Sequence, residues 1–595
     1  MSSLLKYLND YKRECVLAPL FKMLEAVFEL FVPLVVADII DRGIGGSDSA
    51  YIISRTMLMI GLGVVGLISA VSAQFFAAKA ATGFSQSLRH DLFKHILSLS
   101  HKEIDELSSS TMITRMTSDV NQAQTGVNMF LRLFLRSPFI VFGAMIMAFT
   151  IDFKAALLFV GLIAVLFAVV AAIMRFNIPM LKKVQLKLDR ITLLTRENLS
   201  GSRVIRAFCL EEKEQEGFRR ENDEYINVQL KAGHISALLN PLTFVIVNIA
   251  IIILIHTGAL RVSTGALTQG KVIALYNYMS QILVELVKFA NLIITINKAL
   301  ASAGRISEVF AITPSIVTLD GEERISQDAG EDLSQGSIRD PEAEKKADPL
   351  PADPAVVEFD NVSFKYNENG DEALSGISFK VLAGETVGII GGTGSGKTTV
   401  VNLIPRFYDA NSGCVRVFGK DVKNQDATEL RNRIGIVPQK AVLFAGSIAE
   451  NMRWGRKDAS DQEIMEAIDL SAASEVVMEK GGIRAMAEQN GANFSGGQKQ
   501  RLTIARALVR KPDILILDDS ASALDYMTDL KLRTNIRSLS YKPTVFIISQ
   551  RTSTIKNADR ILVMDDGELL AQGRHEELLE SCPVYKEIHD SQYSK

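Results

Sequence analysis

The 595-residue sequence predicts an all-α domain of six membrane-crossing helices followed by an α/β domain. Repeated apolar runs occupy about the first half of the chain, an acidic segment with several prolines comes next, and strand and helix patterns alternate beyond it. These observations place the helical domain at residues 1–315, a linker at 316–354 and the α/β domain at 355–595.

The helical domain is predicted from runs close to the ~20 apolar residues that a helix needs to cross a bilayer core. They lie at residues 16–41, 53–80, 128–151, 155–177, 238–260 and 272–297. The first run follows an amphipathic start at 4–11 without the cleavage site of a signal peptide, so we expect a retained helix. The stretches 84–127 and 178–237 have helix-forming composition, and we expect them to extend the spans as long arms.

The basic residues predict the orientation in the membrane. Lysine and arginine gather between the fourth and fifth runs, whereas the turn between the third and fourth offers only Lys154. Because loops rich in lysine and arginine face the cytoplasm, we expect both termini and the α/β domain there. The protein would then be a multi-pass protein of the cell (inner) membrane, in contact with the lipid bilayer.

Charge and cysteine content exclude other classes of protein. Lys and Arg number 65 against 68 Asp and Glu, so no basic excess points to a nucleic-acid partner. The four cysteines are far apart and form no CxxC pair, which argues against a disulfide framework or a zinc site. A reducing cytoplasm suits them.

The predicted linker is strongly acidic. Residues 319–354 include four prolines and few large apolar side chains, a composition that cannot easily bury a core. This favours a flexible solvated segment over a regulatory one.

A P-loop follows the strand expected at 386–390 and opens a helix. Its glycines let backbone N–H groups surround phosphates. Lys397 reaches the β and γ phosphates, and the hydroxyl of Thr398 is a Mg²⁺ ligand. The strand–loop–helix context argues against a chance glycine-rich turn. ATP and Mg²⁺ are therefore the predicted cofactors, bound by Gly391, Gly392, Thr393, Gly394, Ser395, Gly396, Lys397, Thr398 and Thr399.

A second apolar strand is expected at 514–517, and it delivers Asp518 to the same edge of the sheet. In P-loop proteins an acid at this place holds the Mg²⁺ that bridges the phosphates. An apolar run that ends in Asp is weak by itself, but it is a strong indication beside a P-loop.

The run Phe494-Ser495-Gly496-Gly497-Gln498 resembles the ABC signature, and the whole chain resembles a bacterial multidrug-type ABC exporter half-transporter. The resemblance implies a transmembrane domain of ABC exporter type and a nucleotide-binding domain. It also implies a Q-loop glutamine and metal ligand at Gln439, an adenine-stacking aromatic at Tyr366 and a D-loop at 522–525. Tyr366 alone would be an ordinary strand aromatic. The implied nucleotide-binding residues are Tyr366, Gln439, Asp518, Ser495, Gly496, Gly497, Gln498 and Asp525.

Glu197, Gly201 and the run 204–208 are similar to a stretch that recurs in exporters. By this resemblance the bends of the two arms are coupling helices, of which at least one reaches the partner chain. The first span begins almost at once, which argues against a peptidase domain before it.

Two positions depart from the family pattern. Asp519 stands where active ABC domains have glutamate, and Gln550 stands where they have the switch histidine. A carboxylate withdrawn by ~1 Å can cost about 10²-fold in rate, and glutamine cannot titrate. The site is expected to hold MgATP and hydrolyse it slowly, although neutral drift within a working site is the alternative. Since the signature is intact, we expect a heterodimer with a different half-transporter that carries the missing glutamate and histidine.

Charges within predicted spans are candidates for binding a small-molecule substrate. Lys22, Glu25 and Glu29 share one face of the first run, and Glu285 and Lys288 lie in the sixth. Glu25, Glu29 and Glu285 would bind an amphiphilic or cationic cargo, for which Glu29 is well suited. Alternatively, Lys22 and Glu25 lie at the cytoplasmic interface, and Glu285 and Lys288 form a helix-stabilising pair.

Three functions are compatible with the sequence. An export pump for amphiphilic, drug-like or lipid-like substrates comes first. A lipid or siderophore carrier on the same fold, or an ATP-gated channel or regulator without transport, are the alternatives.

Overall fold

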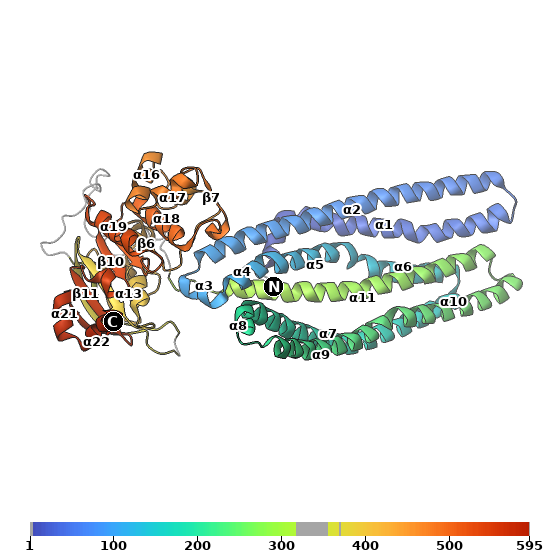
Figure 1. Ribbon diagram of the computed structural model, residues 1–595. Coiled ribbons are helices and arrows are strands. Elements are labelled where there is room, and N and C mark those ends of the chain that lie inside the picture. Colours follow the sequence, from blue (N-terminus) through green and yellow to red (C-terminus); the bar gives the residue numbers. More distant parts are fainter. Residues whose placement is uncertain (1–3, 317–354, 368–369, 594–595) are drawn as a thin grey trace, which may run out of the picture. The chain divides into compact units, whose positions relative to one another are not determined.

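The computed structural model describes residues 4–316, 355–367 and 370–593 (Figure 1). The chain divides into two compact units, Met1–Leu97 with Ser108–Thr313, and Ser98–Leu107 with Pro314–Lys595. Apart from Ile316, the segment 316–354 that was predicted as a linker lies outside the described residues.

The first unit is built from long helices. In chain order they are η1 (Leu4–Tyr11), α1 (Lys12–Asp38), η2 (Ile39–Ile44), α2 (Ser49–Ser98), α4 (Ser109–Thr114), η3 (Arg115–Asp119), α5 (Val120–Leu133), α6 (Arg136–Ile151), α7 (Phe153–Ser200), α8 (Ser202–Ala207), α9 (Glu211–Ala237), α10 (Leu239–Ser263) and α11 (Gln269–Ala311). At ~1.5 Å per residue, α2 extends about 75 Å, far more than a bilayer core of about 30 Å. The helical arms expected beyond the spans are therefore present.

Five helical stretches among the described residues are long and apolar enough to cross a membrane. They are Ser49–Ser98, Ser109–Ile151, Phe153–Ser200, Glu211–Ser263 and Gln269–Ala311. The predicted first span is the 27-residue helix α1, which is long enough but is not among the five. Its Lys22, Glu25 and Glu29 lower the apolar content, which is the physical reason for the difference from six. Ala26 and Leu30 of α1 nevertheless pack in the same apolar core as Ile140 and Leu275.

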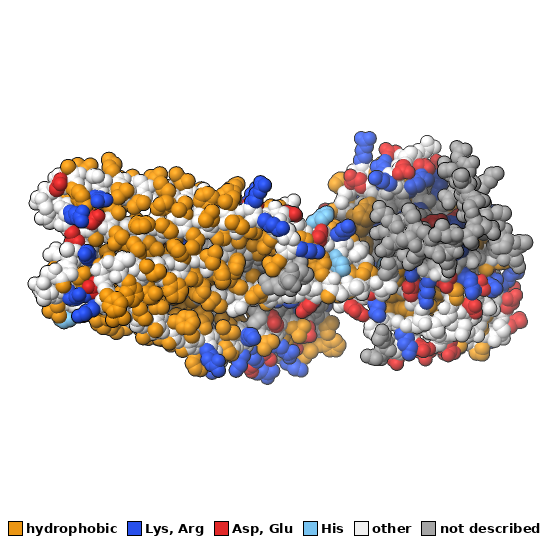
Figure 2. Space-filling model, turned by 180° about the vertical axis from the view of Figure 1, so that it is seen from behind, with side chains coloured by type: hydrophobic (Ala, Val, Ile, Leu, Met, Phe, Trp, Pro, Cys, Tyr) orange, Lys and Arg blue, Asp and Glu red, His pale blue; other side chains and the backbone are white. Residues whose placement is uncertain are grey.

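The outer surface of the helical unit is apolar. Large side chains such as Leu67, Phe167 and Ile252 are more than half exposed. Figure 2 shows hydrophobic side chains covering the middle of the helices, with charged side chains gathered toward their ends. Such a continuous apolar surface is typical of contact with lipid.

The second unit contains a six-stranded sheet and a four-stranded sheet. The first has the order β12 (Glu568–Gly573), β11 (Arg560–Asp565), β3 (Thr386–Gly391), β10 (Thr544–Ile548), β9 (Ile514–Asp518) and β6 (Ile434–Val437). All its pairs are parallel except β11 with β12. The second, antiparallel, has the order β2 (Leu374–Leu382), β1 (Ala355–Phe364), β4 (Ser412–Val417) and β5 (Lys420–Asp421).

Helices and two short strands complete this unit. They are α3 (His101–Leu107), α13 (Lys397–Leu403), η5 (Val422–Asn424), α14 (Ala427–Asn432), β7 (Gly446–Ser447), α15 (Ile448–Arg453), α16 (Asp461–Leu470), α17 (Ser474–Glu479), β8 (Met486–Ala487), η6 (Gln489–Gly491), α18 (Gly496–Val509), α19 (Tyr526–Arg537), α20 (Thr552–Ile555), α21 (His575–Ser581) and α22 (Pro583–Tyr593). On one face of the parallel sheet, Ile389, Ile516 and Phe546 are buried in one apolar core.

The strand register brings four loops to one edge. Ile548 of β10 pairs with Ile389 on one side and with Asp518 on the other, and Val437 of β6 pairs with Leu517. The carboxyl ends of β3, β10, β9 and β6 are therefore level, and such an edge is where open α/β sheets bind ligands.

The bend of the first arm packs within the second unit. The ring of His101 in α3 stacks on Phe407 with centroids 4.2 Å apart, and the Tyr408 hydroxyl donates to Asp105 at 2.8 Å. The bend of the second arm is α8, which has no buried residue.

Candidate nucleotide site and charge network

The P-loop connects β3 to α13 in a turn that requires glycine. Gly394 and Gly396 have φ of +86° and +90°, in the left-handed region that favours glycine. A Cβ on Gly391 would lie 2.0 Å from the carbonyl oxygen of Met564. Gly392 and Thr393 form the exposed tip of the loop together with Gly394. Its backbone N–H groups are thus free to surround an anion.

Lys397 is buried within the curve of this loop. Its Nζ donates to the carbonyl oxygens of Gly391 (3.0 Å) and Gly392 and to the hydroxyl of Ser395 (3.1 Å). Burial lowers the pKa of the Lys397 ammonium, although the nearby carboxylates of Asp518 and Asp519 act in the opposite direction. The arrangement provides a positive charge where the β and γ phosphates are expected.

Thr398 and Asp518 form the candidate Mg²⁺ site. The Thr398 hydroxyl lies 3.2 Å from both carboxylate oxygens of Asp518. Burial raises the pKa of Asp518, and the charge of Asp519 adds to this. Hard oxygen ligands of this kind suit Mg²⁺, which is usually held by one or two protein groups plus phosphates.

The donor set therefore fits a nucleotide-bound Mg²⁺. Thr398 and Asp518 would hold the ion, with Gln439 at the same edge. When bound, the ion neutralises charge on the phosphates.

Gln439, Asp519 and Gln550 come from the other loops at this edge. The Gln439 amide donates to Asp519, with Nε2 3.5 Å from Oδ2. Asp519 has φ of 45°, and its N–H donates to the carbonyl of Ile548 at 3.1 Å. Gln550 follows β10 and is exposed, and its carbonyl accepts a hydrogen bond from Gln592 at 2.7 Å. Of the two positions that depart from the family pattern, Asp519 follows β9, which ends in Asp518. Gln550 follows β10, which lies between β9 and the P-loop strand β3.

Tyr366 lies just beyond β1. Its hydroxyl is 3.0 Å from the hydroxyl of Thr399, next to the P-loop helix. Its ring meets Phe364 and Tyr408 edge to face, at centroid distances of 4.9 and 5.2 Å, and remains 39% exposed. Partial burial of the Tyr366 side chain raises the pKa of its hydroxyl. A ring that is fixed by its neighbours and partly exposed to solvent is suited to stacking on a nucleotide base.

The signature residues form the N-terminus of α18. The Ser495 hydroxyl accepts from the N–H of Gln498 at 3.4 Å, and the Gln498 side chain accepts from the N–H of Ser495 at 2.9 Å. A Cβ on Gly496 would meet nothing within 4 Å, whereas one on Gly497 would lie 2.8 Å from the carbonyl oxygen of Ala523. A helix N-terminus with such an open glycine can receive an anion. No hydrogen bond between described residues joins this group to the P-loop of the same chain.

Asp525 has a local role. It caps α19, accepting from the N–H of Thr528 at 2.9 Å and from its hydroxyl at 2.7 Å. Its carboxylate therefore caps a helix, and both of the hydrogen bonds described for it come from Thr528.

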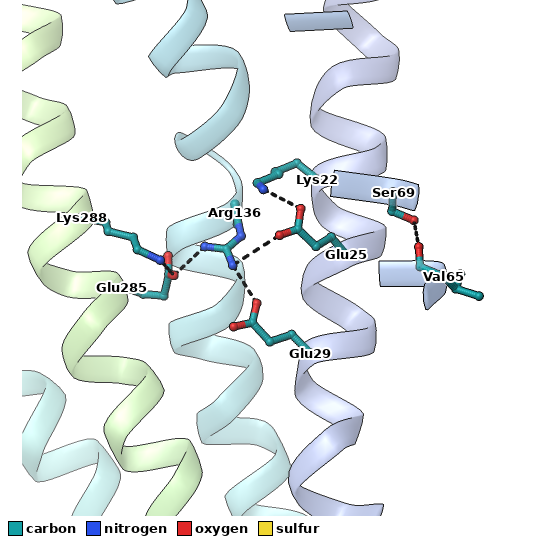
Figure 3. A network of polar contacts seen from close by, with 8 residues as sticks. All are labelled: Lys22, Glu25, Glu29, Val65, Ser69, Arg136, Glu285 and Lys288. Carbon is teal, nitrogen blue, oxygen red and sulfur yellow. Dashed lines mark hydrogen bonds and ion pairs between the residues drawn. The ribbon is translucent and has the colours of Figure 1, made fainter. Parts of the chain in front are cut away.

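The three candidate substrate carboxylates converge on one arginine, as Figure 3 shows. Arg136 is paired with Glu29 at 2.7 Å, with Glu25 at 3.8 Å and with Glu285 at 2.5 Å. Lys22 pairs with Glu25 at 2.5 Å, and Lys288 pairs with Glu285 at 2.8 Å. Ser137 also donates to Glu285, at 3.0 Å. We call these residues the Arg136 network: Lys22, Glu25, Glu29, Arg136, Ser137, Glu285 and Lys288.

Sequence reasoning missed Arg136, the centre of this network. The expected helix-stabilising pair of Glu285 and Lys288 is present, as is the pair of Lys22 and Glu25. An arginine inside the third apolar run was the available signal, because a charge within a span needs a partner.

Comparisons with known proteins agree with this architecture. Residues 15–286 match the protein family described as "ABC transporter transmembrane region", and residues 374–522 match the family described as "ABC transporter". An uncharacterized ABC transporter ATP-binding protein, YfiB of Bacillus subtilis, is 35% identical over all of this chain and 99% of its own length. An ATP-dependent lipid A-core flippase of Chromobacterium violaceum is 30% identical over all of this chain and 97% of its own length.

A solved structure shows the same fold. The bacterial Atm1-family ABC exporter with ATP bound superposes with a TM-score of 0.77, covering 98% of this chain and 99% of that one at 24% identity. With a helical membrane unit, a P-loop unit and relatives that match both along the whole chain, this protein belongs to the ABC transporter family and has the fold of an ABC exporter half-transporter.

Proposed function

We propose that this chain is the slowly hydrolysing half of a heterodimeric exporter in the cell (inner) membrane, with its termini and nucleotide-binding domain in the cytoplasm. The observation that carries the proposal is the pair of substitutions, Asp519 and Gln550, at the edge where the P-loop and Asp518 meet. The groups that bind MgATP are retained there, whereas both groups expected to drive hydrolysis are changed.

The position of Asp519 supports slow hydrolysis as part of this proposal. Its backbone hydrogen bond to Ile548 fixes its Cα beside β10, so the shorter side chain cannot recover the reach of a glutamate by a shift of the strand end. A water molecule placed for reaction beside a glutamate would therefore lie farther from the Asp519 carboxylate, by about the length of one methylene group. Gln550 adds no titratable group.

The intact signature supports a different partner chain. ABC domains pair head to tail, so Ser495 and Gly496 serve the ATP on the partner's P-loop. Their capped helix start and the open space at Gly496 are suited to that role. The partner would carry the glutamate and the histidine that this chain lacks.

The bend of the second arm also supports association with another chain. Helix α8 has no buried residue, and Val204 and the following Phe208 are 58% and 71% exposed. Exposed apolar side chains at the end of a cytoplasmic arm are suited to docking on the partner's nucleotide-binding domain.

The cargo is proposed to be amphiphilic, either drug-like or lipid-like. The continuous apolar surface gives such a molecule access from the bilayer, and relatives named as lipid A-core flippases favour the lipid-like end of this range. A lipid carrier is thus the second candidate. Movement of a labelled amphiphile in proteoliposomes would exclude a channel or regulator that does not transport.

The test is the ATPase activity of the purified chain alone in proteoliposomes. We expect low activity, restored by co-expression with the partner. The double variant Asp519→Glu/Gln550→His should raise the activity of the isolated chain by about 10²-fold, since it returns the withdrawn carboxylate and the titratable group. The same double variant with Lys397→Ala is the matched control and should stay inactive. Vigorous hydrolysis by the unmodified chain alone would overturn the proposal.

A further inference from the structure

The Arg136 network contains three cations and three carboxylates. Lys22, Arg136 and Lys288 balance Glu25, Glu29 and Glu285, so its net charge is zero. Glu29, Arg136 and Glu285 each lie within about four residues, or ~6 Å along a helix, of the centre of an expected span. Charges at this depth are costly unless they are compensated, and they mark functional sites by default.

The two ends of the network remain accessible. The side chains of Glu29 and Lys288 are 40% and 44% exposed, whereas those of Arg136 and Glu285 are almost completely buried. Within the described ranges Glu29 has Arg136 as its one polar partner, and the buried Nε of Arg136 has no hydrogen-bond partner. The accessible groups are thus a carboxylate and an ammonium, separated by a buried ion pair.

An apolar cavity of about 760 Å³ lies along the helices that hold the network. Its lining includes Cys15 and Val16 of α1, Phe130 and Leu131 of α5, and Ile296 and Leu300 of α11. Val16 is about 9 Å along α1 from Lys22 and about 20 Å from Glu29, and Ile296 is about 12 Å along α11 from Lys288. This size lies within the ~300–1,000 Å³ range of small-molecule sites.

We propose that the Arg136 network and this cavity form one binding site for a single-chain zwitterionic amphiphile. The ammonium of its headgroup binds Glu29, its anionic group binds Lys288, and its alkyl chain occupies the apolar cavity. The inference names a class within the amphiphilic cargo proposed above, and it does not depend on the slow ATP site.

Charge balance selects a zwitterion over a simple cation. A cation bound at Glu29 would give the site a net charge of +1, and an anion at Lys288 would give −1. Either charge would remain uncompensated in a medium of low dielectric constant. A zwitterion places a charge against each accessible group and leaves the sum at zero.

The test compares three dodecyl compounds below their micelle-forming concentrations: dodecylphosphocholine, dodecyltrimethylammonium and dodecyl phosphate. Binding of each radiolabelled compound is measured on the full-length chain in amphipols without nucleotide. We expect the phosphocholine to bind the unmodified chain at least tenfold more tightly than the other two. Equal binding of all three would overturn the proposal.

Two variants alter the charge balance in opposite directions. Glu29→Gln makes the network +1 and should shift the preference to dodecyl phosphate, whereas Lys288→Gln makes it −1 and should shift the preference to dodecyltrimethylammonium. Glu14→Gln is the matched control, because Glu14 is also on α1 and is also paired, with Lys79 at 2.8 Å, but lies outside the network. An equal change of ligand preference in Glu29→Gln and Glu14→Gln would contradict the assignment of Glu29 to the binding site. Lys288 is half exposed, so its variant keeps the test open if the Glu29 variant fails to fold.

The cavity has its own reporter. Cys15 lines it, whereas Cys209 is exposed elsewhere. Dodecylphosphocholine should slow alkylation of Cys15 by N-ethylmaleimide at least tenfold and leave Cys209 unchanged, as read by peptide mass spectrometry. Unprotected Cys15 would show that the alkyl chain does not enter the cavity. Because no nucleotide is present, neither assay changes if the ATP site proves to be fully active.

Discussion

The hydroxyl oxygen of Thr398 lies 3.2 Å from each carboxylate oxygen of Asp518, although the two residues are 120 positions apart. Thr398→Val keeps the shape of the side chain and removes this oxygen ligand. We expect Mg²⁺ to strengthen ATP binding by at least tenfold in the unmodified chain and much less in the variant, because Mg²⁺ needs oxygen ligands from the protein. Titration with a fluorescent ATP analogue, with Mg²⁺ or with EDTA, measures this difference. An unchanged Mg²⁺ effect would refute the metal assignment.

Lys397→Ala should weaken ATP binding by about 10–100-fold, since it removes charge-assisted hydrogen bonds to the phosphates. The same titration measures the loss. Lys420→Ala is a suitable control, because Lys420 is exposed on β5 and should leave the affinity unchanged. Unchanged affinity in the Lys397 variant would exclude the P-loop assignment.

Asp519→Asn should reduce the ATPase activity of the assembled heterodimer only slightly, since this site contributes little turnover. Were Asp519 the main catalytic carboxylate, its loss would cost about 10²-fold or more. Steady-state ATPase of the co-expressed pair decides between these outcomes. Removal of the partner's catalytic glutamate serves as the comparison and should abolish most activity.

Arg136→Met should destabilise the helical unit by about 3–5 kcal/mol, because it leaves buried Glu285 without its central partner. The matched control is Arg55→Gln. Arg55 is 3.7 Å from Asp38 in a partly exposed pair, which is worth about 0–1 kcal/mol. Thermal unfolding of both variants in the same detergent gives the comparison, and equal losses would contradict a central role for Arg136.

Gly497→Ala should destabilise the second unit by about 1–3 kcal/mol, because its Cβ would press on the Ala523 carbonyl at 2.8 Å. Gly496→Ala is the control in the same turn, since its Cβ meets nothing within 4 Å. We expect a lower melting temperature for the first variant alone. A normal melting temperature for Gly497→Ala would show that the loop can move away from the added methyl group.

The P-loop and its strand were predictable because their signals are local. An apolar run, closely spaced glycines, lysine and threonine specify β3, the turn and the start of α13 without knowledge of the remaining fold. Asp518 could be added because parallel strands end at one edge. The unusual residues Asp519 and Gln550 were identified from a resemblance along the chain, and the strand register then showed that both follow strands at that edge.

The Arg136 network depends on contacts between residues far apart in the sequence. The charges on α1 were visible in the sequence, but Glu29 and Arg136 are 107 positions apart, and Arg136 and Glu285 are 149 apart. No periodicity within one helix reveals which face of α6 meets α1 and α11. The sequence by itself therefore determined the apolar runs and the P-loop, because each is a pattern of neighbouring residues, and its resemblance to a family marked the altered positions. Only the tertiary structure decided that six membrane charges form one neutral network, because their compensation depends on the packing of three helices.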